Sequence, residues 1–283
     1  MMSQGRKTWI GILLAALAWS SHASEPLPVL MLAPDTPQAT RFRAALEAAP
    51  EQPVRIVADT AAARLVLALG EAAFAEALRG TLPVIGVHVP EQVVADARAA
   101  GCRCTAVYRE ATVAAQLLVL REILPGARRV GVLLGPDSSR HQSALVAPGL
   151  LFDVRSVSRA DALPAVLGDL LPRVDVLLAL PDAALYNAET ARLLLLASYR
   201  QNTPVIGPDE QFVRAGSLAA AQPSPDALME ATLTLLQHQG LPEQLPPPVH
   251  ARSGLSFNAR VARSYGVIAP DIDAIGQHLE SMP

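Results

Sequence analysis

Four apolar runs in the chain end in the dipeptide Pro-Asp, so that a carboxylate follows each of four segments with the composition of buried strands. Short unbroken apolar runs are typical of the strands of a parallel sheet. Open α/β sheets bind ligands at the carboxyl ends of their strands, so these carboxylates are candidates for holding an ammonium or another cationic group. Aspartate is also a favoured N-cap of helices, and capping alone is the ordinary alternative for each. The four residues are Asp35, Asp137, Asp182 and Asp209.

Two polar turns and several aromatic side chains extend this set of candidates. The loop 135–140 contains Ser138 and Ser139 at a predicted helix start, where hydroxyls and backbone N–H groups can hold a carboxylate or phosphate. A serine-rich cap without a ligand is equally ordinary, so both explanations stay open. Gly70 and Glu71 form a similar strand-to-helix turn in the first half of the chain. Aromatic residues near strand ends could stack on a flat ligand, although each is more often a packing residue: Phe74, Tyr108, Tyr186 and Phe212.

The first 23 residues have the pattern of a secretory signal peptide. Arg6 and Lys7 precede an apolar stretch at 9–19 that is too short to span a bilayer, and residues 21–23 form a small-x-small cleavage pattern. No cysteine follows the predicted cleavage site, so we expect a periplasmic protein without a lipid anchor. Removing two of the 23 basic residues leaves 21 against 26 acidic ones, a net charge of −5, which argues against a nucleic-acid surface.

Cys102 and Cys104 are the two cysteines of the chain. Because exported cysteines usually pair, an intramolecular disulfide is our first interpretation, with a metal or redox role as the alternative. Apart from His22, the histidines are scattered without metal-ligand spacing, and the only lysine is Lys7. The chain has no Gly-x-Gly-x-x-Gly, Walker or Gly-x-Ser-x-Gly motif. We therefore expect no cofactor, no metal and no enzymatic activity.

Predicted strands and helices alternate almost to the end of the chain. The helix predicted at 111–124 stops at Leu124-Pro125-Gly126, which is a candidate crossover between two βα series of similar size. This pattern predicts two α/β lobes with a cleft between them; one continuous doubly wound sheet is the alternative. The predicted strands cover 28–33, 53–58, 64–69, 83–89, 104–108, 129–134, 151–157, 174–180, 204–207 and 217–221. The predicted helices cover 37–48, 71–79, 91–99, 111–124, 160–171, 183–201, 225–239 and a segment from Ala259 that ends in a short tail.

Four segments of the chain, taken in order, resemble one family. The leucine-rich helix followed by Leu-Pro and Val-Gly-Val-Leu at 117–134 is similar to a crossover in one group of ABC-transporter substrate-binding proteins. That group includes binders of tryptophan and other aromatic amino acids. Segment 175–182 resembles its strand ending in Pro-Asp, and 203–219 resembles its "Pro-Val … Glu … Val-Lys-x-Gly-Ala-Leu-Ala" signature. Segment 257–270 resembles its closing "Asn-x-x-x-Ala-x-x-Leu-Gly-x-x-x-Pro".

The resemblance implies a type I periplasmic-binding-protein fold, with two Rossmann-like lobes of parallel strands, three crossovers and a ligand held in the cleft. It implies that residues 24–125 plus 217–250 form lobe 1, that 126–216 form lobe 2, and that 251–283 return to the hinge. Hinge rotation would occur near Pro125, 212–217 and 246–253. By position, the resemblance and the strand ends together give these candidate ligand contacts: Asp182, Ser138, Ser139, Asp137, Asp209, Glu210, Gly70, Glu71 and Tyr186.

Three departures from the family pattern fall in lobe 1. Only residues 59–64 separate two predicted strands where the family has a full helix, so we expect a trimmed lobe. Glu71 stands where a hydroxyl is usual, and Cys102 and Cys104 stand where the family commonly has Asn-x-Thr-Gly. We expect these changes to face the ligand, so the identity of the ligand does not transfer.

The sequence therefore predicts a periplasmic solute-binding protein of an ABC-type uptake system. It would be a monomer that binds a small polar solute, such as an amino-acid-like one, and presents it to a permease in the inner membrane. The alternative is a non-transport envelope protein with a degenerate binding-protein fold, acting as a ligand sensor or accessory interaction partner. Asp182 is the first candidate for ligand contact and Asp35 the last.

Overall fold

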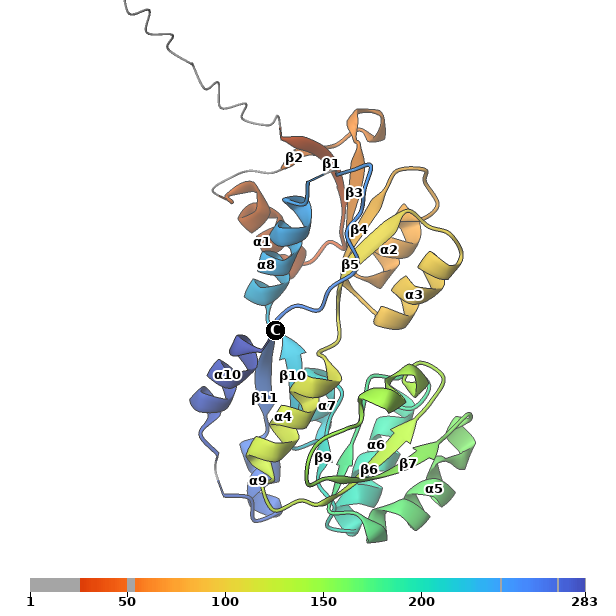
Figure 1. Ribbon diagram of the computed structural model, residues 1–283, viewed down its shortest axis with the longest axis vertical. Helices are drawn as coiled ribbons and strands as arrows, with labels where there is room; N and C mark the ends of the chain where they lie inside the picture. The colour runs from red at the N-terminus through yellow and green to blue at the C-terminus, as the bar shows by residue number, and fades with distance from the viewer. Residues whose placement is uncertain (1–25, 50–53, 240, 269, 283) are drawn as a thin grey trace, which may run out of the picture.

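The computed structural model describes residues 26–49, 54–239, 241–268 and 270–282. The predicted signal peptide and its cleavage site lie outside these ranges. Two α/β lobes are stacked along the long axis of the molecule and are joined at a narrow waist (Figure 1). The predicted architecture of two lobes with parallel sheets is confirmed.

Lobe 1 is built on a five-stranded parallel sheet in the order β2-β1-β3-β4-β5. Its strands alternate between two apolar faces: Leu65 and Leu67 point to one face, Val66 and Ala68 to the other. Both faces are buried, which explains why these strands are continuous apolar runs. The strands are β1 (Leu27–Leu32), β2 (Val54–Val57), β3 (Leu65–Leu69), β4 (Val84–Val89) and β5 (Cys104–Tyr108).

Two pairs of helices cover the sheet of lobe 1. One pair, α1 and α8, packs on one face, although α8 comes from a distant part of the sequence; α2 and α3 cover the other (Figure 1). Between β2 and β3 the chain forms only the short 3-10 turn η1 (Thr60–Ala62), as expected for a trimmed lobe. The helices are α1 (Pro37–Glu47), α2 (Glu71–Ala77), α3 (Glu91–Ala99) and α8 (Pro225–Leu236).

Lobe 2 is built on a six-stranded sheet in the order β11-β10-β9-β8-β6-β7, in which only the edge strand β11 is antiparallel. Helices α4 and α10 cover one face, and α5, α6 and α7 cover the other. The strands are β6 (Arg129–Leu134), β7 (Leu151–Ser156), β8 (Val176–Leu178), β9 (Val205–Ile206), β10 (Ala219–Pro223) and β11 (Ser253–Phe257). The helices are α4 (Val113–Ile123), α5 (Leu163–Leu170), α6 (Ala188–Arg200), α7 (Glu210–Ala215), α9 (Ala259–Ser264) and α10 (Ile272–Ser281), with 3-10 turns η2 (Ser139–Ala144), η3 (Ala160–Ala162) and η4 (Leu171–Arg173).

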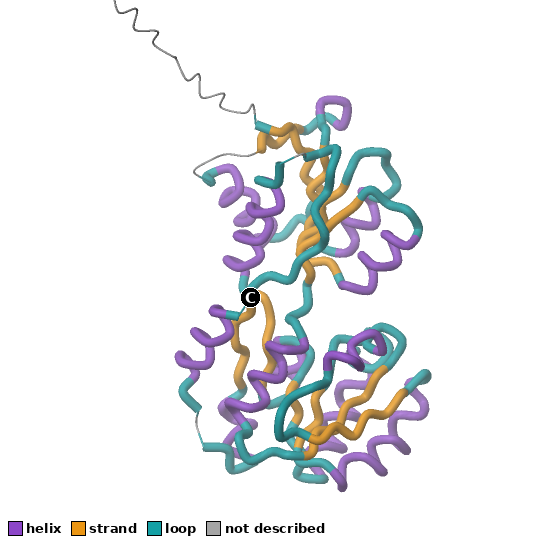
Figure 2. Tube along the Cα trace, viewed as in Figure 1, coloured by secondary structure: helices purple, strands orange, loops and turns teal. Residues whose placement is uncertain are grey.

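The chain passes between the lobes three times, and the first two passages differ from those predicted near Pro125 and 212–217, whereas the third lies within the predicted 246–253. It crosses before α4, between β10 and α8, and between Val249 and β11. The three connecting segments can be followed at the waist in Figure 2. Helix α4 packs on β9, β10 and α10, so it belongs to lobe 2, and so does β10, which pairs with β9 and β11. The predicted boundaries at residues 125 and 217 therefore differ from the structure, because local sequence patterns do not specify which sheet a helix or strand joins.

Two helices also differ from prediction at their ends. The predicted helix 183–201 begins only at Ala188, because Asn187 and Thr190 form a reciprocal capping box that starts α6 there. The predicted C-terminal tail is helix α10, which packs against β11 and α4. Among the helices in the described ranges, none combines the length and apolar character needed to cross a bilayer.

Candidate ligand-binding cleft

A cavity of about 870 Å³ lies between the lobes, at the carboxyl ends of strands from both sheets. Lobe 1 lines it with the loop after β1, with α1, and with the ends of β3 and β4. Lobe 2 lines it with the segments after β8 and β9, and the start of α8 closes one side. Open α/β sheets bind small ligands at this edge, and cavities of this size are typical of such sites.

Apolar side chains form a large part of the cavity wall. They come from α1 and α8 as well as from the strand ends, and two prolines of the Pro-Asp strand ends face them from lobe 2. A ligand held among them would be separated from water, which strengthens each polar contact that it makes. The apolar lining includes Phe42, Leu69, Leu228 and Met229, with Pro181 and Pro208 on the lobe 2 side.

His88 lies at the end of β4 in an uncommon backbone conformation. Its φ is +60°, at an irregularity in strand pairing between Val87 and Val89, and its side chain is exposed to the cavity. Residues other than glycine rarely adopt this left-handed region, and those that do are concentrated at functional sites. The cleft walls desolvate the imidazole, and with the positive charge of Arg109 they lower the pKa of His88. The neutral ring therefore predominates at neutral pH.

Arg109 and Arg41 add cationic groups to the lobe 1 wall. Arg109 directly follows β5, and its guanidinium nitrogens lie 3.9 Å from the Glu71 carboxylate and 3.5 Å from that of Glu110. These separations are long for charge-assisted hydrogen bonds, so Arg109 can donate to a ligand anion without breaking a short internal pair. The side chain of Arg41, on α1, has no ion pair or hydrogen bond with any residue in the described ranges. Neither arginine was identified from the sequence. Arg109 directly follows a predicted strand, and the strand-end rule applied to the Pro-Asp pairs could have found it.

Glu110 is a nearly buried carboxyl beside Arg109, with 11% of its side chain exposed. Its Oε2 accepts a hydrogen bond of 3.0 Å from the backbone N–H of Glu91. Burial raises the pKa of Glu110 above its ordinary value, and the opposing influence of Arg109 does not cancel this effect. Through this hydrogen bond, Glu110 connects the cavity wall to the backbone at the start of α3.

The lobe 2 wall carries carboxylates and amides. Asp209 caps α7, since its Oδ1 accepts a hydrogen bond of 2.9 Å from the N–H of Phe212, but its side chain remains exposed toward the cavity. Glu210 also lines the cavity and pairs with Arg214 at 2.6 Å. The Gln222 side-chain oxygen accepts from the Glu210 N–H at 2.9 Å, which leaves the Gln222 amide N–H groups available to a ligand. Asp209 and Glu210 thus lie where the sequence predicted, on the cavity wall.

Asp182 lines the cavity, but its carboxylate is already fully engaged by the protein. Oδ2 accepts from the N–H groups of Asp137 and Ser138, both at 3.0 Å, and from the Ser138 hydroxyl at 2.9 Å. Oδ1 accepts from the N–H groups of Ala184 and Leu185, at 3.1 and 3.2 Å. With 4% of the residue exposed, Asp182 holds the loop after β6 against the loop after β8. The first candidate for ligand contact is therefore engaged as a structural carboxylate.

The other sequence candidates in the loop after β6 are Asp137, Ser138 and Ser139, and none of them lines the cavity. Their hydrogen bonds belong to the network that joins this loop to the loop after β8, here called the loop interlock. The Asp137 carboxylate accepts from the N–H of Ala183 at 3.0 Å, so the two loops clamp each other in both directions. The buried Ser138 hydroxyl also accepts from the N–H of Gly135 at 2.9 Å. The Ser139 hydroxyl donates to the Pro136 carbonyl at 3.2 Å. Their polar groups are thus used within the β6 loop or between it and the loop after β8.

We expect Gly135→Ala to destabilise the protein by about 1–3 kcal/mol, because the added methyl group would overpack this interlock. A Cβ at position 135 would meet the Asp182 carboxylate oxygens at 2.5 and 2.7 Å. Thermal unfolding measured by calorimetry checks this. Gly126→Ala is the matched control, because a Cβ there meets nothing within 4 Å. Equal unfolding temperatures for the two variants would contradict the expected crowding.

Gly70 and Tyr186 line the cavity, whereas Glu71 does not. Gly70 caps α2 with a φ of +86°, a conformation that favours glycine. The Tyr186 hydroxyl donates to the Leu133 carbonyl at 3.3 Å, and its ring packs edge-on against Phe212 with centroids 5.8 Å apart. Burial, and then the Asp182 carboxylate, raise the pKa of Tyr186, so the phenol stays protonated. Tyr186 therefore presents a fixed aromatic surface to the cavity.

Asp35, ranked last by sequence, is exposed, and Thr36 rather than Asp35 caps α1. The Thr36 hydroxyl accepts from the N–H of Ala39 at 3.2 Å and lines the cavity. The residue that caps the helix after the first strand is therefore one position later than the predicted Asp35.

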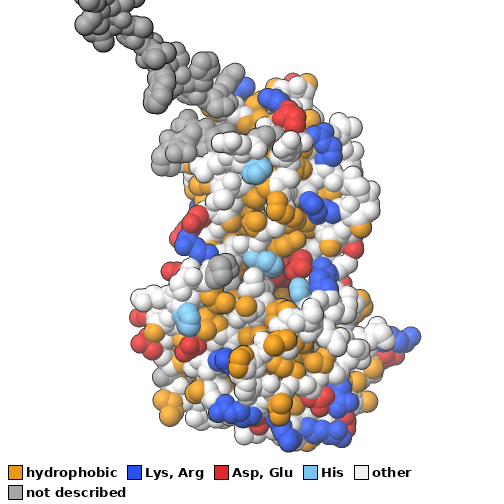
Figure 3. All heavy atoms as spheres, viewed as in Figure 1, with side chains coloured by type: hydrophobic (Ala, Val, Ile, Leu, Met, Phe, Trp, Pro, Cys, Tyr) orange, Lys and Arg blue, Asp and Glu red, His pale blue; other side chains and the backbone are white. Residues whose placement is uncertain are grey.

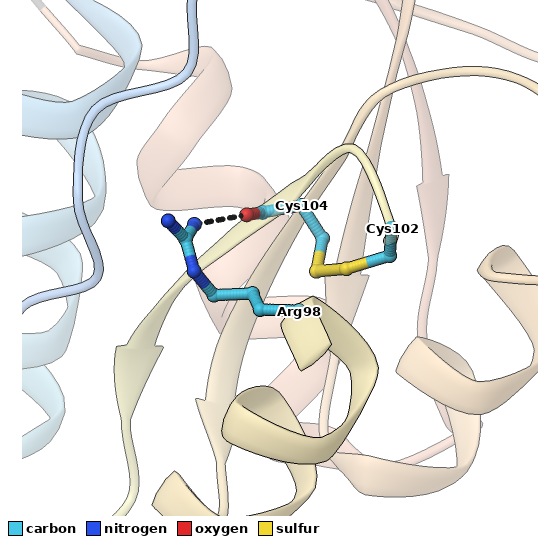
Figure 4. Close-up of a disulfide and its surroundings, with 3 residues drawn as sticks. All are labelled: Arg98, Cys102 and Cys104. Atoms are coloured by element: carbon cyan, nitrogen blue, oxygen red, sulfur yellow. Dashed lines mark hydrogen bonds between the residues drawn. A yellow bond between two sulfur atoms is a disulfide. The ribbon is translucent and has the colours of Figure 1, made fainter. Parts of the chain in front are cut away.

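Cys102 and Cys104 are joined in a disulfide at the start of β5. The side chain of Arg98, from α3, lies beside Cys104 and donates a 2.7 Å hydrogen bond to the Cys104 carbonyl (Figure 4). This is the amino end of β5, opposite the strand end that faces the cleft, and the cysteines line a separate cavity of about 230 Å³. The expectation that this change faces the ligand was therefore wrong. Within the described ranges, no group of three or more His, Cys, Asp or Glu side chains is arranged to hold a metal ion.

Comparison with known proteins supports the fold and leaves the sequence family open. No family model matches the chain, and no curated protein matches it in sequence. Three solved structures of similar architecture are 15 or 16% identical to it. Because identity is so low, these likenesses establish the type I periplasmic-binding-protein fold and nothing finer.

Three such structures cover most of the chain. A ligand-free, open structure of CD0873, a substrate-binding protein with adhesive properties from Clostridium difficile, has a TM-score of 0.62 and 16% identity over 88% of this chain and 97% of that one. An ABC domain from Streptococcus pneumonia in complex with L-Trp has a TM-score of 0.55, 16% identity and the same coverage. A conserved domain protein from Vibrio cholerae has a TM-score of 0.53 and 15% identity over 88% of this chain and 96% of that one.

Proposed function

We propose that this protein binds a small polar solute in its interlobe cleft and closes around it by rotation at the three crossovers. In this proposal it is the periplasmic component of an ABC-type uptake system and delivers the solute to a permease in the inner membrane. The observation that carries the proposal is the cavity of about 870 Å³ at the carboxyl ends of strands from both lobes. A solute bridging two such walls favours the closed arrangement, because it contacts both lobes only there.

The distribution of charge in the cleft favours a solute with both an anionic and a cationic group. The two arginines of the lining, Arg109 and Arg41, are on the lobe 1 side, together with Asp226 of α8, whereas Asp209 and Glu210 are on the lobe 2 side and Glu110 is on the first crossover. A zwitterion, such as an amino-acid-like solute, would place its carboxylate near Arg109 and its ammonium near Asp209. The neutral His88 imidazole could add a neutral hydrogen bond to either group. This orientation does not use the serine loop, which is occupied by Asp182.

A thermal-shift screen of the purified protein with amino acids and related solutes tests the proposal. We expect at least one zwitterionic solute to raise the unfolding temperature. At a concentration of about 100 times its dissociation constant, the solute adds roughly 2.7 kcal/mol to the free energy of unfolding. The corresponding monoanionic and monocationic analogues, each lacking one charge, should stabilise less. No stabilisation by any solute, with a cleft found filled by its own side chains, would contradict the proposal.

The engagement of Asp182 and Ser138 within the protein favours a second candidate function. A binding-protein fold whose expected ligand groups are used internally could serve as an envelope sensor or an accessory interaction partner. Neighbouring genes discriminate between the two: an adjacent permease and ATPase support transport, whereas a sensor kinase or outer-membrane receptor supports the alternative. Neither candidate involves turnover of the ligand.

A further inference from the structure

One carboxylate at the waist of the molecule is approached from both lobes. Glu91, in the first turn of α3 in lobe 1, has its Oε1 3.8 Å from Arg140 Nη1 and its Oε2 3.5 Å from His141 Nε2, both on η2 of lobe 2. Oε2 also lies 3.9 Å from Nε2 of His250, which is on the third crossover. We refer to Glu91, Arg140, His141 and His250 as the Glu91 clasp. Figure 3 shows histidine, acidic and basic side chains gathered at this waist.

The Glu91 clasp lies beside the cleft and is half-buried. The side chains of Glu91 and His141 are 21% and 23% exposed, and none of the four residues lines the cavity. Glu110 connects the two regions, because it lines the cavity and accepts the backbone N–H of Glu91. Relative movement of the lobes must therefore make or break the contacts of Glu91 with Arg140 and His141.

The charges around Glu91 come from every segment packed against it. Arg140 and His141 approach from η2, and Glu110 approaches from the first crossover. His250 is oriented by its Nδ1, which lies 3.0 Å from the Glu110 carbonyl oxygen and must donate to it, and by Tyr108, whose ring centroid is 4.7 Å away. The Glu91 carboxylate thus already has the Arg140 guanidinium as a partner without a proton on either imidazole.

A proton on His141 would add a second cation beside Arg140. Burial lowers the pKa of His141 below the ordinary value of 6.5, and Arg140 and His250 act in the same direction against the opposing attraction of Glu91. When the lobes separate, the ring is solvated and regains its ordinary pKa. The separated arrangement therefore binds the proton more readily, so acidification below about pH 6.5 favours separation.

We propose that the Glu91 clasp is a pH-dependent latch, which holds the lobes in contact at neutral pH and releases them when His141 takes up a proton. The latch would regulate the cleft described above, and in that sense it rests on the proposed binding function. Its physical effect is a change in interlobe contact that needs no solute, so the two proposals can fail separately.

Small-angle X-ray scattering of the ligand-free protein, between about pH 7.5 and pH 5, tests the latch. We expect the radius of gyration to rise as the pH falls, while circular dichroism stays unchanged. In His141→Gln, which cannot take up the proton, we expect this rise to be lost. In Glu91→Gln, which removes the anion, we expect the larger radius already at neutral pH.

His278→Gln is the matched control. His278 forms a similar histidine–glutamate pair with Glu122, at 3.5 Å, but both residues belong to lobe 2. We expect this variant to keep the full pH response. A wild-type radius that is constant or falls on acidification would overturn the latch, as would an undiminished rise in His141→Gln.

Discussion

Asp182→Ala is expected to lower the free energy of unfolding by about 3–5 kcal/mol, because it removes the acceptor of a buried hydrogen-bond network. Five donors, four backbone N–H groups and one hydroxyl, point at this carboxylate. Without it four of them lose their acceptor in a site where the residue is 4% exposed, while the Leu185 N–H keeps the backbone carbonyl of residue 182 at 3.2 Å. Asp182→Asn keeps one carbonyl oxygen as acceptor, and we expect a smaller loss. Chemical denaturation followed by far-ultraviolet circular dichroism measures both.

Asp35→Ala is the matched control, because Asp35 also belongs to a Pro-Asp pair at the end of a strand. Its side chain is exposed, and Thr36 caps the helix in its place. We expect its effect to stay within about 0.5 kcal/mol. If Asp182→Ala unfolded like the wild type but lost solute binding, Asp182 would be a ligand contact, as first predicted from sequence, and its structural role would be minor.

Arg109→Gln is expected to weaken binding of a zwitterionic solute by about 30-fold, which is the loss of about 2 kcal/mol for one charge-assisted hydrogen bond. Arg109 lines the cavity and lies on the segment between β5 and α4, and its own ion pairs, at 3.5 and 3.9 Å, are long. With 45% of its side chain exposed, its removal should change stability little. Calorimetric titration with the solute found by thermal shift gives the affinity.

Arg43→Gln provides the control for charge alone. Arg43 lies on α1, pairs with Glu47 four residues on and does not line the cavity. We expect its affinity to match the wild type. Equal affinities for Arg109→Gln and the wild type would show that the solute carboxylate is held elsewhere, and Arg41, on the same wall, would be the next residue to replace.

The charged residues of the cleft fall into two groups: those that hold loops in place and those exposed to the cavity. Asp182 and Asp137 hold two loops of lobe 2 together, whereas Arg109 and Asp209 line the cavity and keep charged atoms exposed beside their internal contacts. A resemblance that transfers residue roles by position cannot make this distinction. It depends on which donors surround each carboxylate in three dimensions.

Much of the local structure could be predicted because its causes are local. Unbroken apolar runs mark strands buried on both faces, and alternation with amphipathic helices predicts parallel sheets. The strands around Leu67 and Val132 and the helix stop at Leu124 are encoded within a few residues. The same reasoning placed Asp182, Asp209 and Gly70 at the sheet edge where the cavity lies. The helix that starts at Ile272 was missed because its apolar residues were taken for a tail.

The assignment of elements to lobes could not be predicted in this way. Helix α4 has the same amphipathic pattern whichever sheet it covers, and only its packing on β9 and β10 places it in lobe 2. Strand β10 likewise joins lobe 2 through partners in β9, 13 residues away along the chain, and in β11, 30 to 38 residues away. Pairing over such separations is a property of the folded chain.

By itself, the sequence determined the fold class, most of the strands and helices, and the sheet edge at which the cavity lies. These depend on periodicity and capping, which act within a few residues. Only the tertiary structure decided what each polar side chain does there. Asp182 meets its donors from Asp137 and Ser138 across 44 or 45 residues of chain, and Glu91 meets His141 from the other lobe. A carboxylate is structural or free according to the groups that folding brings to it, and those groups lie far away in the sequence.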